Sequence, residues 1–322
     1  MLVAASRVLE GAQLPLRLLD LGHPPARVHL FGELPQGPAV AIVGTRNPTL
    51  EAGRFAFRLA ADLCRAGVAV FSGGAEGIDA AAHLGALRSR GTTVVVAPSG
   101  YFAPFPKRHA PLFARVLAGG GAYLSLVADG AVAHPSNFFA RNAALAALAH
   151  VLVVVEMPYR SGARNAARWA RKLERPVLIV PTVPWNPAGR GCLLELRRGA
   201  LLCEGPKDVL RELERVLFLP EKTLKVPERA PPASSALPVA SAQIALPFPP
   251  AAAEKAELDA VARAVLAGAA HQDAICERSG LPAATVQRHV LTLTLGGVLA
   301  ADPAGGFRWV SATQPVLRRK NS

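Results

Sequence analysis

Short apolar runs alternate with longer helical patterns between residue 39 and about residue 218. Each run is four or five residues long and rich in Val, Ile or Leu, which is typical of a strand buried in a parallel sheet. The runs cover 40–43, 68–71, 93–97, 123–126, 151–155 and 177–180. Gly67, Gly91 and glycines 119–121 each stand just before a run, where a helix ends. The alternation predicts an α/β fold with a Rossmann-like, doubly wound parallel sheet.

The pattern changes after this region. Residues 220–250 are rich in Pro, Ala and Ser and lack helical periodicity, so we expect an extended linker. Residues 273–290 then predict a helix, a glycine turn and a second helix, and 296–310 predict a hairpin, which together make a small C-terminal winged-helix domain. The predicted parts are an N-terminal lead-in segment (1–37), a Rossmann-like domain (38–218), a linker (219–251), a winged-helix domain (252–311) and a basic tail (312–322).

Glycine turns follow three of the predicted strands, and the carboxyl ends of parallel strands share one edge of a sheet. The first turn is Gly44-Thr45-Arg46, where the glycine permits close approach of a ligand and the arginine matches a phosphate. We also expect free amides at the following helix start to face such a ligand. The other turns are Ser72-Gly73-Gly74 and Ser161-Gly162. One such turn can simply connect a strand to a helix, but three of them favour a shared phosphate-binding crevice.

Two further segments offer groups that suit a nucleic acid. Residues 137–142 open a helix with Asn137, Phe138, Arg141 and Asn142, so amides and an arginine can meet phosphates while Phe138 stacks on a base. We expect Phe139 to lie in the core. Four arginines at helical spacing form a basic stripe. We favour a solvated face for its far end, whereas Arg164 at its start lies beside the Ser161-Gly162 turn.

Candidates for catalysis are weaker. Asp79 and His83 follow Ser72 in the sequence, but they lie one turn apart on a predicted helix that leads away from the turn. We therefore expect His83 to be a residue through which this helix packs. Glu156 ends a predicted strand and can act as a base or balance local charge. The sequence predicts no catalytic residues, and hence a binding protein and not an enzyme.

Charge favours a polyanionic partner. The chain has 36 Lys and Arg against 23 Asp and Glu, a net charge of +13. Residues 1–218 carry a net +10 and the tail +3, whereas residues 252–310 carry −1. The second helix of the predicted winged helix offers only Arg288 and His289, so we favour a protein-contacting or structural role for that domain over duplex recognition.

Cysteines and hydropathy limit the remaining classes. The four cysteines are widely spaced without a C-x-x-C pair, which predicts reduced thiols and no metal or cofactor. Arg7, Glu10 and Arg17 interrupt the first nineteen residues, which therefore lack the continuous apolar region of a secretory signal. No later run approaches the ~20 apolar residues of a membrane span. We therefore expect a cytoplasmic protein with no membrane partner.

Four motifs, in order, resemble those of the bacterial DNA processing protein A family (DprA, also called Smf). They are Ala41-Ile42-Val43-Gly44-Thr45-Arg46, residues 72–83, residues 137–142, and Val153-Val154-Val155-Glu156 with Ser161-Gly162. The resemblance runs from about residue 15 to residue 310. It implies a homodimer that binds single-stranded DNA, protects incoming DNA and loads the RecA recombinase in natural transformation. It also implies a phosphate contact for Lys107, a C-terminal winged helix, and within 1–37 only the exit segment of a helical domain.

Several positions depart from the family pattern. The usual Ala-Arg-Gly is Ala75-Glu76-Gly77, and Tyr-Pro-x-Glu-Asn is residues 105–109, Phe-Pro-Lys-Arg-His. The family's Ser-Gly-x-x-x-Thr-Ala motif corresponds to residues 161–167, where Ala166 replaces the threonine. Its Arg-Gly-x-Asn motif corresponds to residues 190–193, where Leu193 replaces the asparagine.

Two other functions fit parts of the sequence. Nucleotide phosphoribohydrolases of the lysine-decarboxylase-like type share glycine-turn Rossmann cores, but their Pro-Gly-Gly-x-Gly-Thr-x-x-Glu turn is replaced here by residues 158–165, without the threonine or the acid. A transcription regulator that acts through the winged helix is disfavoured by the charge of residues 252–310.

Overall fold

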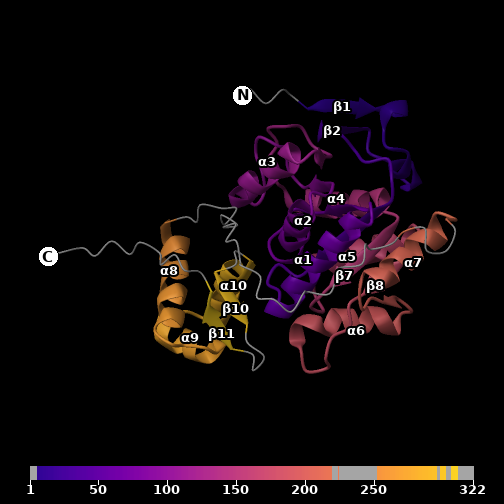
Figure 1. The fold of residues 1–322 in the computed structure, drawn as a ribbon. Coiled ribbons are helices and arrows are strands. Elements are labelled where there is room, and N and C mark those ends of the chain that lie inside the picture. Colours follow the sequence, from indigo (N-terminus) through magenta and orange to yellow (C-terminus); the bar gives the residue numbers. More distant parts are fainter. Residues whose placement is uncertain (1–5, 220–223, 225–251, 296–297, 302–305, 311–322) are drawn as a thin grey trace. The chain divides into compact units, whose positions relative to one another are not determined.

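The computed structural model describes residues 6–219, 224, 252–295, 298–301 and 306–310. The chain divides into two compact units, Met1–Arg229 and Ala230–Ser322 (Figure 1). The expected linker, apart from residues 219 and 224, and the expected basic tail lie outside the described residues.

One nine-stranded sheet forms the centre of the first unit. In chain order the strands are β1 (Arg7–Glu10), β2 (Arg27–Gly32), β3 (Ala39–Gly44), β4 (Ala69–Ser72), β5 (Thr93–Ala97), β6 (Ala122–Ser125), β7 (Val151–Val155), β8 (Val177–Ile179) and β9 (Leu201–Leu202). Their order across the sheet is β1-β2-β6-β5-β4-β3-β7-β8-β9. The seven strands β3 to β9 are parallel to one another, and β1 and β2 are antiparallel to their neighbours. The predicted Rossmann-like sheet, with its six strands β3 to β8, is confirmed.

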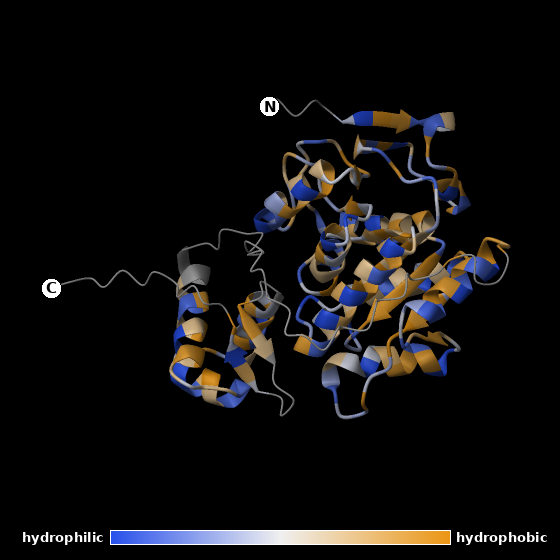
Figure 2. Cartoon of the chain, viewed as in Figure 1, coloured by the Kyte–Doolittle hydropathy of each residue, from blue (hydrophilic) through white to orange (hydrophobic). Residues whose placement is uncertain are grey.

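Helices cover both faces of this sheet, which buries its parallel strands on two sides. The helices are α1 (Leu50–Arg65), α2 (Ile78–Arg88), α3 (Ala110–Ala118), α4 (Pro135–Leu148), α5 (Gly162–Lys172), α6 (Arg190–Arg197) and α7 (Pro206–Val216), with 3-10 turns η1 (Gly11–Gln13), η2 (Leu16–Asp20), η3 (Lys107–His109) and η4 (Pro187–Gly189). Side chains alternate along β3: Val40 and Ile42 pack with α1, α2 and α7, and Ala41 and Val43 pack with α4 and α5. Figure 2 shows the hydrophobic residues concentrated along the strands.

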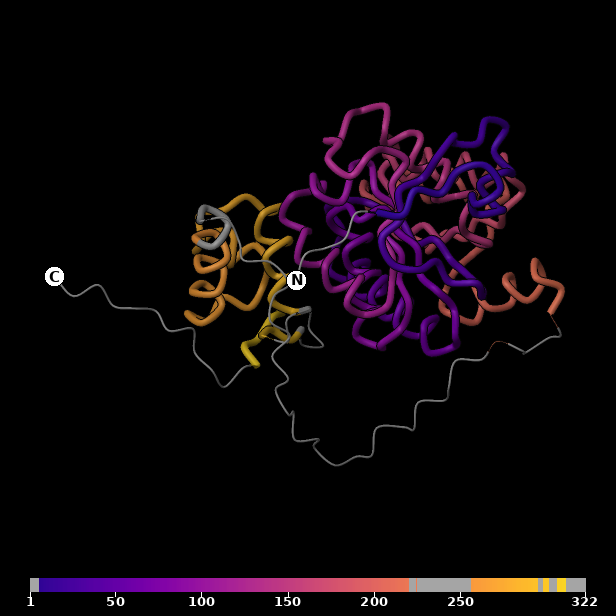
Figure 3. The backbone as a smooth tube through the Cα atoms, turned by 90° about the horizontal axis from the view of Figure 1, so that it is seen from above, coloured from indigo at the N-terminus to yellow at the C-terminus, as the bar shows by residue number. Residues whose placement is uncertain are grey.

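The lead-in segment contributes to the same sheet. Strand β2 pairs with β6, and Figure 3 shows this N-terminal part of the trace against the rest of the unit. Leu18 of η2 is fully buried, and the Arg17 guanidinium donates to the Leu148 carbonyl at 2.7 Å. Residues 7–32 are therefore part of the first unit's core.

The second unit is the predicted winged helix. It consists of α8 (Ala252–Leu266), α9 (Gln272–Ser279), α10 (Ala283–Leu295) and the antiparallel strands β10 (Leu299–Ala301) and β11 (Phe307–Trp309). Gly280 ends α9 in the left-handed conformation at φ +68°, as the predicted glycine turn requires. Val261, Ile275 and Val286 are fully buried. The predicted hairpin turns at 296–297 and 302–305 lie outside the described residues.

The strand order places a crevice beside β3. From β3 the chain proceeds outward through β4, β5 and β6, and then returns to β7 on the other side of β3. Connections on the two sides of such a reversal lead to opposite faces of the sheet, so a gap opens at the carboxyl ends of β3 and β7.

Candidate nucleic-acid interface

A pocket of about 290 Å³ occupies this switch point between β3 and β7. Its walls come from the turn after β3, the start of α2, the first turns of α4 and the loop that leads into α5. Of the fourteen predicted site residues, eight line it: Gly44, Thr45, Arg46, Phe138, Arg141, Asn142, Ser161 and Gly162. The structure thus brings together turns that are more than a hundred residues apart in the sequence.

The turn after β3 is built by backbone packing. A Cβ atom on Gly44 would collide with the Val155 carbonyl oxygen, so the glycine lets β3 lie close to the end of β7. The Thr45 amide donates to the Glu156 carbonyl at 2.8 Å. The expectation of free amides at the start of α1 is wrong for two of them, because the Thr49 amide donates to the Glu156 carboxylate at 2.6 Å and the Ala52 amide to the Thr49 hydroxyl at 3.3 Å.

Phe138 lies at the centre of the cationic side of the pocket. The Arg46 guanidinium lies 5.5 Å from its ring centroid and that of Arg141 6.0 Å, which are cation–π distances. The Phe105 ring meets it edge-on at 5.3 Å. Arg46 is exposed, and no acidic side chain within residues 6–219 forms an ion pair with it. A half-buried ring beside an unpaired guanidinium can take a base and a phosphate together.

Arg141 lies in the pocket lining and is almost fully buried. Its Nη1 lies 3.9 Å from the Asp79 Oδ2 and donates to the Val96 carbonyl at 3.4 Å, and its Nε has no hydrogen-bond partner in the described structure. Burial lowers the pKa of Arg141 and raises the pKa of Asp79, while the charge of each opposes the shift of the other. A Cβ atom on Gly73 would overlap the Arg141 guanidinium, so this glycine makes room for it.

The second glycine turn lies behind the pocket lining. The Ser72 hydroxyl is fully buried and donates to the Ile42 carbonyl at 2.6 Å. The amides of Gly73 and Ala75 donate to the Asp79 carboxylate at 3.1 and 3.3 Å, and Gly74 adopts φ +71°. These residues shape the pocket, and direct DNA contacts by Ser72, Gly73 and Gly74 stay a prediction. Asp79, considered above only for catalysis, instead organises this turn.

The loop into α5 is held to α4 by an amide. The Asn142 Nδ2 donates to the Gly162 carbonyl at 3.2 Å and to the Asn165 Oδ1 at 3.3 Å. The Ser161 hydroxyl accepts from the Ala163 amide at 3.2 Å, as an N-cap. The same loop places exposed Arg160 in the pocket lining. Sequence reasoning missed Arg160, although its position one residue before Ser161 was a usable signal.

Arg164 is directed away from the pocket lining. Its Nε donates to the buried Glu195 carboxylate at 3.4 Å, and its guanidinium lies 4.9 Å from the Tyr159 ring centroid. Glu195 also pairs with Arg171 and, at 3.4 Å, with Arg198. The predicted stripe on α5 is therefore not a row of free cations. A phosphate contact by Arg164 stays a prediction.

Asn137 and Lys107 also lie outside the pocket lining. The Asn137 Nδ2 donates to the Pro98 carbonyl at 3.1 Å, which ties the start of α4 to the end of β5. Lys107 is exposed at the first position of η3. Their roles in DNA binding stay predictions.

Two departures from the family pattern meet in space. Glu76, in place of the usual arginine, forms an ion pair with Arg108, which stands in place of the usual glutamate. In this chain the two unusual residues thus carry opposite charges that meet between the turn after β4 and η3.

Three other sequence expectations can be compared with the structure. Phe139 is 61% exposed and not in the core, because α4 turns Phe138 toward the pocket and its successor about 100° around the helix. Burial lowers the pKa of His83 to about 3, and its Nδ1 lies 2.8 Å from the Thr93 hydroxyl, which fits a packing role. The Glu156 carboxylate accepts from Thr49 and, at 2.9 Å, from the Asn186 amide, so it acts as a cap.

Both basic side chains of α10 are paired within the winged-helix unit. Arg288 Nη2 and His289 Nε2 each lie 3.0 Å from the Glu257 Oε2. The hydrogen bond from His289 is the largest cause that lowers the pKa of Glu257. None of the described helices in either unit is long and apolar enough to cross a membrane.

Comparison with known proteins gives consistent matches. Residues 7–214 match the family of DNA recombination-mediator protein A, and residues 245–305 match the DprA winged helix domain. A DNA processing protein DprA of Mycobacterium tuberculosis is 41% identical over 207 residues, 64% of this chain and 51% of that protein. The chain thus spans about half the length of this curated relative. Protein Smf of Escherichia coli is 31% identical over 95% of this chain and 77% of its own length.

Solved structures agree with the fold. The X-ray structure of DNA processing protein A from Streptococcus pneumoniae superposes with a TM-score of 0.60 at 27% identity, over 65% of this chain and 74% of that one. A Helicobacter pylori DNA processing protein A, described for its single-stranded DNA binding mode, gives 0.58 at 24% identity over 66% of this chain and 97% of that one.

Proposed function

Because this chain belongs to the DNA recombination-mediator protein A family, as its four motifs predicted, we propose that it binds single-stranded DNA in the pocket between β3 and β7. Phosphates approach Arg46 and Arg160 at the pocket rim, and a base stacks on Phe138. Arg141 contributes a buried positive charge from below. Such contacts are independent of base identity, so binding is expected to tolerate any sequence.

The observation that supports this proposal most strongly is that two unpaired charges and an aromatic ring line the same pocket. Arg46 and Arg160 both line the pocket without an ion pair to any described residue, and Phe138 lies beside Arg46 at 5.5 Å. Several other arginines of the unit, such as Arg171 and Arg175, are neutralised by carboxylates, and Arg46 and Arg160 differ from the remaining unpaired arginines because they line the pocket. Unpaired cations are the groups that release counterions from DNA, so this rim offers the electrostatic part of the affinity.

The wider role that we propose follows from the family. The protein acts in the cytoplasm as a homodimer, protects incoming single strands and transfers them to the RecA recombinase in natural transformation. DNA contacts belong to the Rossmann-like domain of residues 38–218, while the winged helix of residues 252–311 serves protein contact or structure.

Fluorescence anisotropy with labelled single strands and duplexes of equal length tests the DNA assignment. We expect single strands to bind more tightly than duplexes. The logarithm of the binding constant should fall linearly with the logarithm of the salt concentration. A preference for duplex, or an affinity independent of salt, would contradict the proposal. Transfer to RecA is measured separately, as the rate at which RecA filaments form on DNA coated with a single-strand-binding protein.

The same preparation tests the phosphoribohydrolase alternative. Release of ribose 5-phosphate from nucleoside monophosphates requires a base that activates water in the pocket. The Glu156 carboxylate accepts three hydrogen bonds from Thr49 and Asn186, which leaves it poorly placed for that task. Turnover that is abolished by Glu156→Gln would favour the enzyme.

A further inference from the structure

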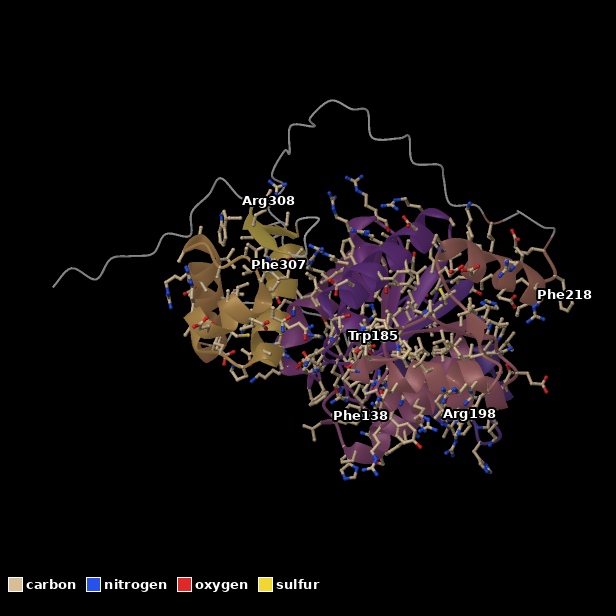
Figure 4. All side chains as sticks on the ribbon, turned by 90° about the horizontal axis from the view of Figure 1, so that it is seen from below. Phe138, Trp185, Arg198, Phe218, Phe307 and Arg308 are labelled. Atoms are coloured by element: carbon tan, nitrogen blue, oxygen red, sulfur yellow. The ribbon has the colours of Figure 1, made fainter. Side chains whose placement is uncertain are left out.

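An exposed tryptophan stands on the loop after β8, at the same edge of the sheet as the pocket. Trp185 is 80% exposed, and it is one of the residues labelled in Figure 4. Strands β7 and β8 are neighbouring parallel strands, so the loops that leave their carboxyl ends are adjacent. The β7 loop supplies Pro158, Arg160 and Ser161 to the pocket.

Hydrogen bonds hold this loop in place. The Asn186 Nδ2, next to Trp185, donates to the Glu156 carboxylate at 2.9 Å and to the Thr182 hydroxyl at 3.2 Å. The Asn186 Oδ1 accepts from the Ala188 amide at 3.0 Å. Prolines at 184 and 187 further restrict the backbone on both sides of the indole. The ring is therefore displayed by an ordered turn that is anchored to the end of β7.

The turn continues into α6, which packs on the pocket loop. The Gly191 amide donates to the Met157 carbonyl at 2.8 Å, and a Cβ atom there would press against the Pro158 carbonyl. The loop with Trp185 and the loop with Arg160 are thus joined both at Glu156 and at Met157.

Charge around the indole matches a polyanion. Residues 157–194 hold seven basic side chains and one acidic side chain, Glu174. Three of the basic groups are paired, Arg164 and Arg171 with Glu195 and Arg175 with Asp20. Arg160 and Arg190 flank the two loops, are exposed, and form no ion pair with the residues that the structure describes. An exposed indole among unpaired cations suits the bases and phosphates of a single strand.

We propose that Trp185 is a second base-stacking site, which extends the single-strand path from the pocket along the carboxyl ends of β7 and β8. The inference rests on the proposed function, since it continues the same strand beyond Phe138. The pocket holds the first nucleotides, and Trp185 receives a base further along, with Arg160 and Arg190 beside the connecting phosphates.

The test compares full-length Trp185→Ala, Trp185→Phe and Phe218→Ala in anisotropy titrations. Phe218 is a matched control, because it is an aromatic residue with 95% exposure just after α7. On a twenty-nucleotide dT strand, we expect Trp185→Ala to weaken binding roughly fivefold or more, since one stacked base contributes about 1 to 3 kcal/mol. Trp185→Phe keeps a stacking face and should retain most of the affinity, and Phe218→Ala should bind as the parent does.

An abasic strand of the same length separates stacking from folding. Without bases, Trp185→Ala and the parent should bind equally, and the oligomeric state in sedimentation should be unchanged. Strand binding should also quench the tryptophan emission of the parent more than that of Trp185→Phe, in which Trp169 and Trp309 remain.

Three results overturn the inference. If Trp185→Ala binds the dT strand as tightly as the parent while Arg46→Ala binds weakly, Trp185 is not on the strand path and the proposed function stands. Equal losses on dT and abasic strands, or an altered oligomeric state, assign the indole to folding or to a subunit contact. A parent that does not bind the dT strand at all refutes the proposed function together with this extension.

Discussion

Basic side chains around the pocket and those on α10 of the winged helix have opposite surroundings. Arg46 and Arg160 line the pocket with no ion pair to the described residues, whereas Arg288 and His289 both contact Glu257 at 3.0 Å. The first pair is available to an anion, and the second is already satisfied inside its own unit. From this difference we expect pairing, and not the number of basic residues, to decide which surface attracts DNA.

The strongest test of this comparison is to remove both rim cations. Arg46→Ala combined with Arg160→Ala should reduce single-strand affinity by about 10- to 100-fold at low salt, because two phosphate contacts are lost. The log-log salt slope should fall by about 1.4, since each contact on a single strand contributes about 0.7. Arg115→Ala, which removes an exposed arginine from α3, is the matched control. An equal loss in the control would show that only bulk charge matters.

A smaller effect is expected from Arg46→Ala alone. Binding should weaken for every sequence by a similar factor, about 3- to 10-fold, and the salt slope should fall by about 0.7. Arg46→Lys keeps the charge but loses the planar group near Phe138, so it should retain the slope with reduced affinity. Unchanged affinity and slope in the alanine variant would remove Arg46 from the site.

Removal of residues 219–322 should cost still less. The deleted part carries only three net positive charges, whereas residues 1–218 carry +10. We therefore expect a fragment that ends at Phe218 to bind single strands within about threefold of the full chain. The comparison requires equal oligomeric state and a cooperative unfolding transition in the fragment. A loss of several orders of magnitude would identify the winged helix as a principal DNA-binding element.

The smallest effect is expected from Glu257→Gln. Loss of this carboxylate frees Arg288 and His289, so DNA affinity should rise by no more than about twofold. Glu277→Gln on α9 is the charge-matched control. A rise confined to Glu257→Gln shows that pairing suppresses the α10 cations, and equal rises in both variants would show a non-specific charge effect.

The same variant carries a pH signature. The pKa of Glu257 is lowered in the folded unit, so its charged form stabilises the fold above the ordinary glutamate pKa, and this contribution is lost as pH falls through the lowered value. Glu257→Gln should therefore unfold at a lower temperature than the parent at pH 7, and the difference between the two unfolding temperatures should shrink toward acidic pH. A constant difference would indicate a packing effect.

Much of the fold was predictable because its signals are local. Strands β3 to β8 are continuous apolar runs, and Gly280 marks the turn between α9 and α10. By contrast, β1 and β2 were missed because these strands at the antiparallel end of the sheet include exposed and polar positions. β9 was missed because two exposed leucines form no recognisable run. Edge pairing depends on a partner strand that the local pattern does not contain.

The sequence by itself determined the two kinds of domain and the glycine turns, because these follow from residue type, spacing and periodicity, and four of its motifs resemble those of the family to which the chain belongs. Only the tertiary structure decided the state of each charged or aromatic group. It placed Arg160 in the pocket, turned Arg164 toward Glu195, and left Phe139 exposed. The physical reason is that pairing and burial depend on distances between elements far apart in the chain, which local periodicity does not encode.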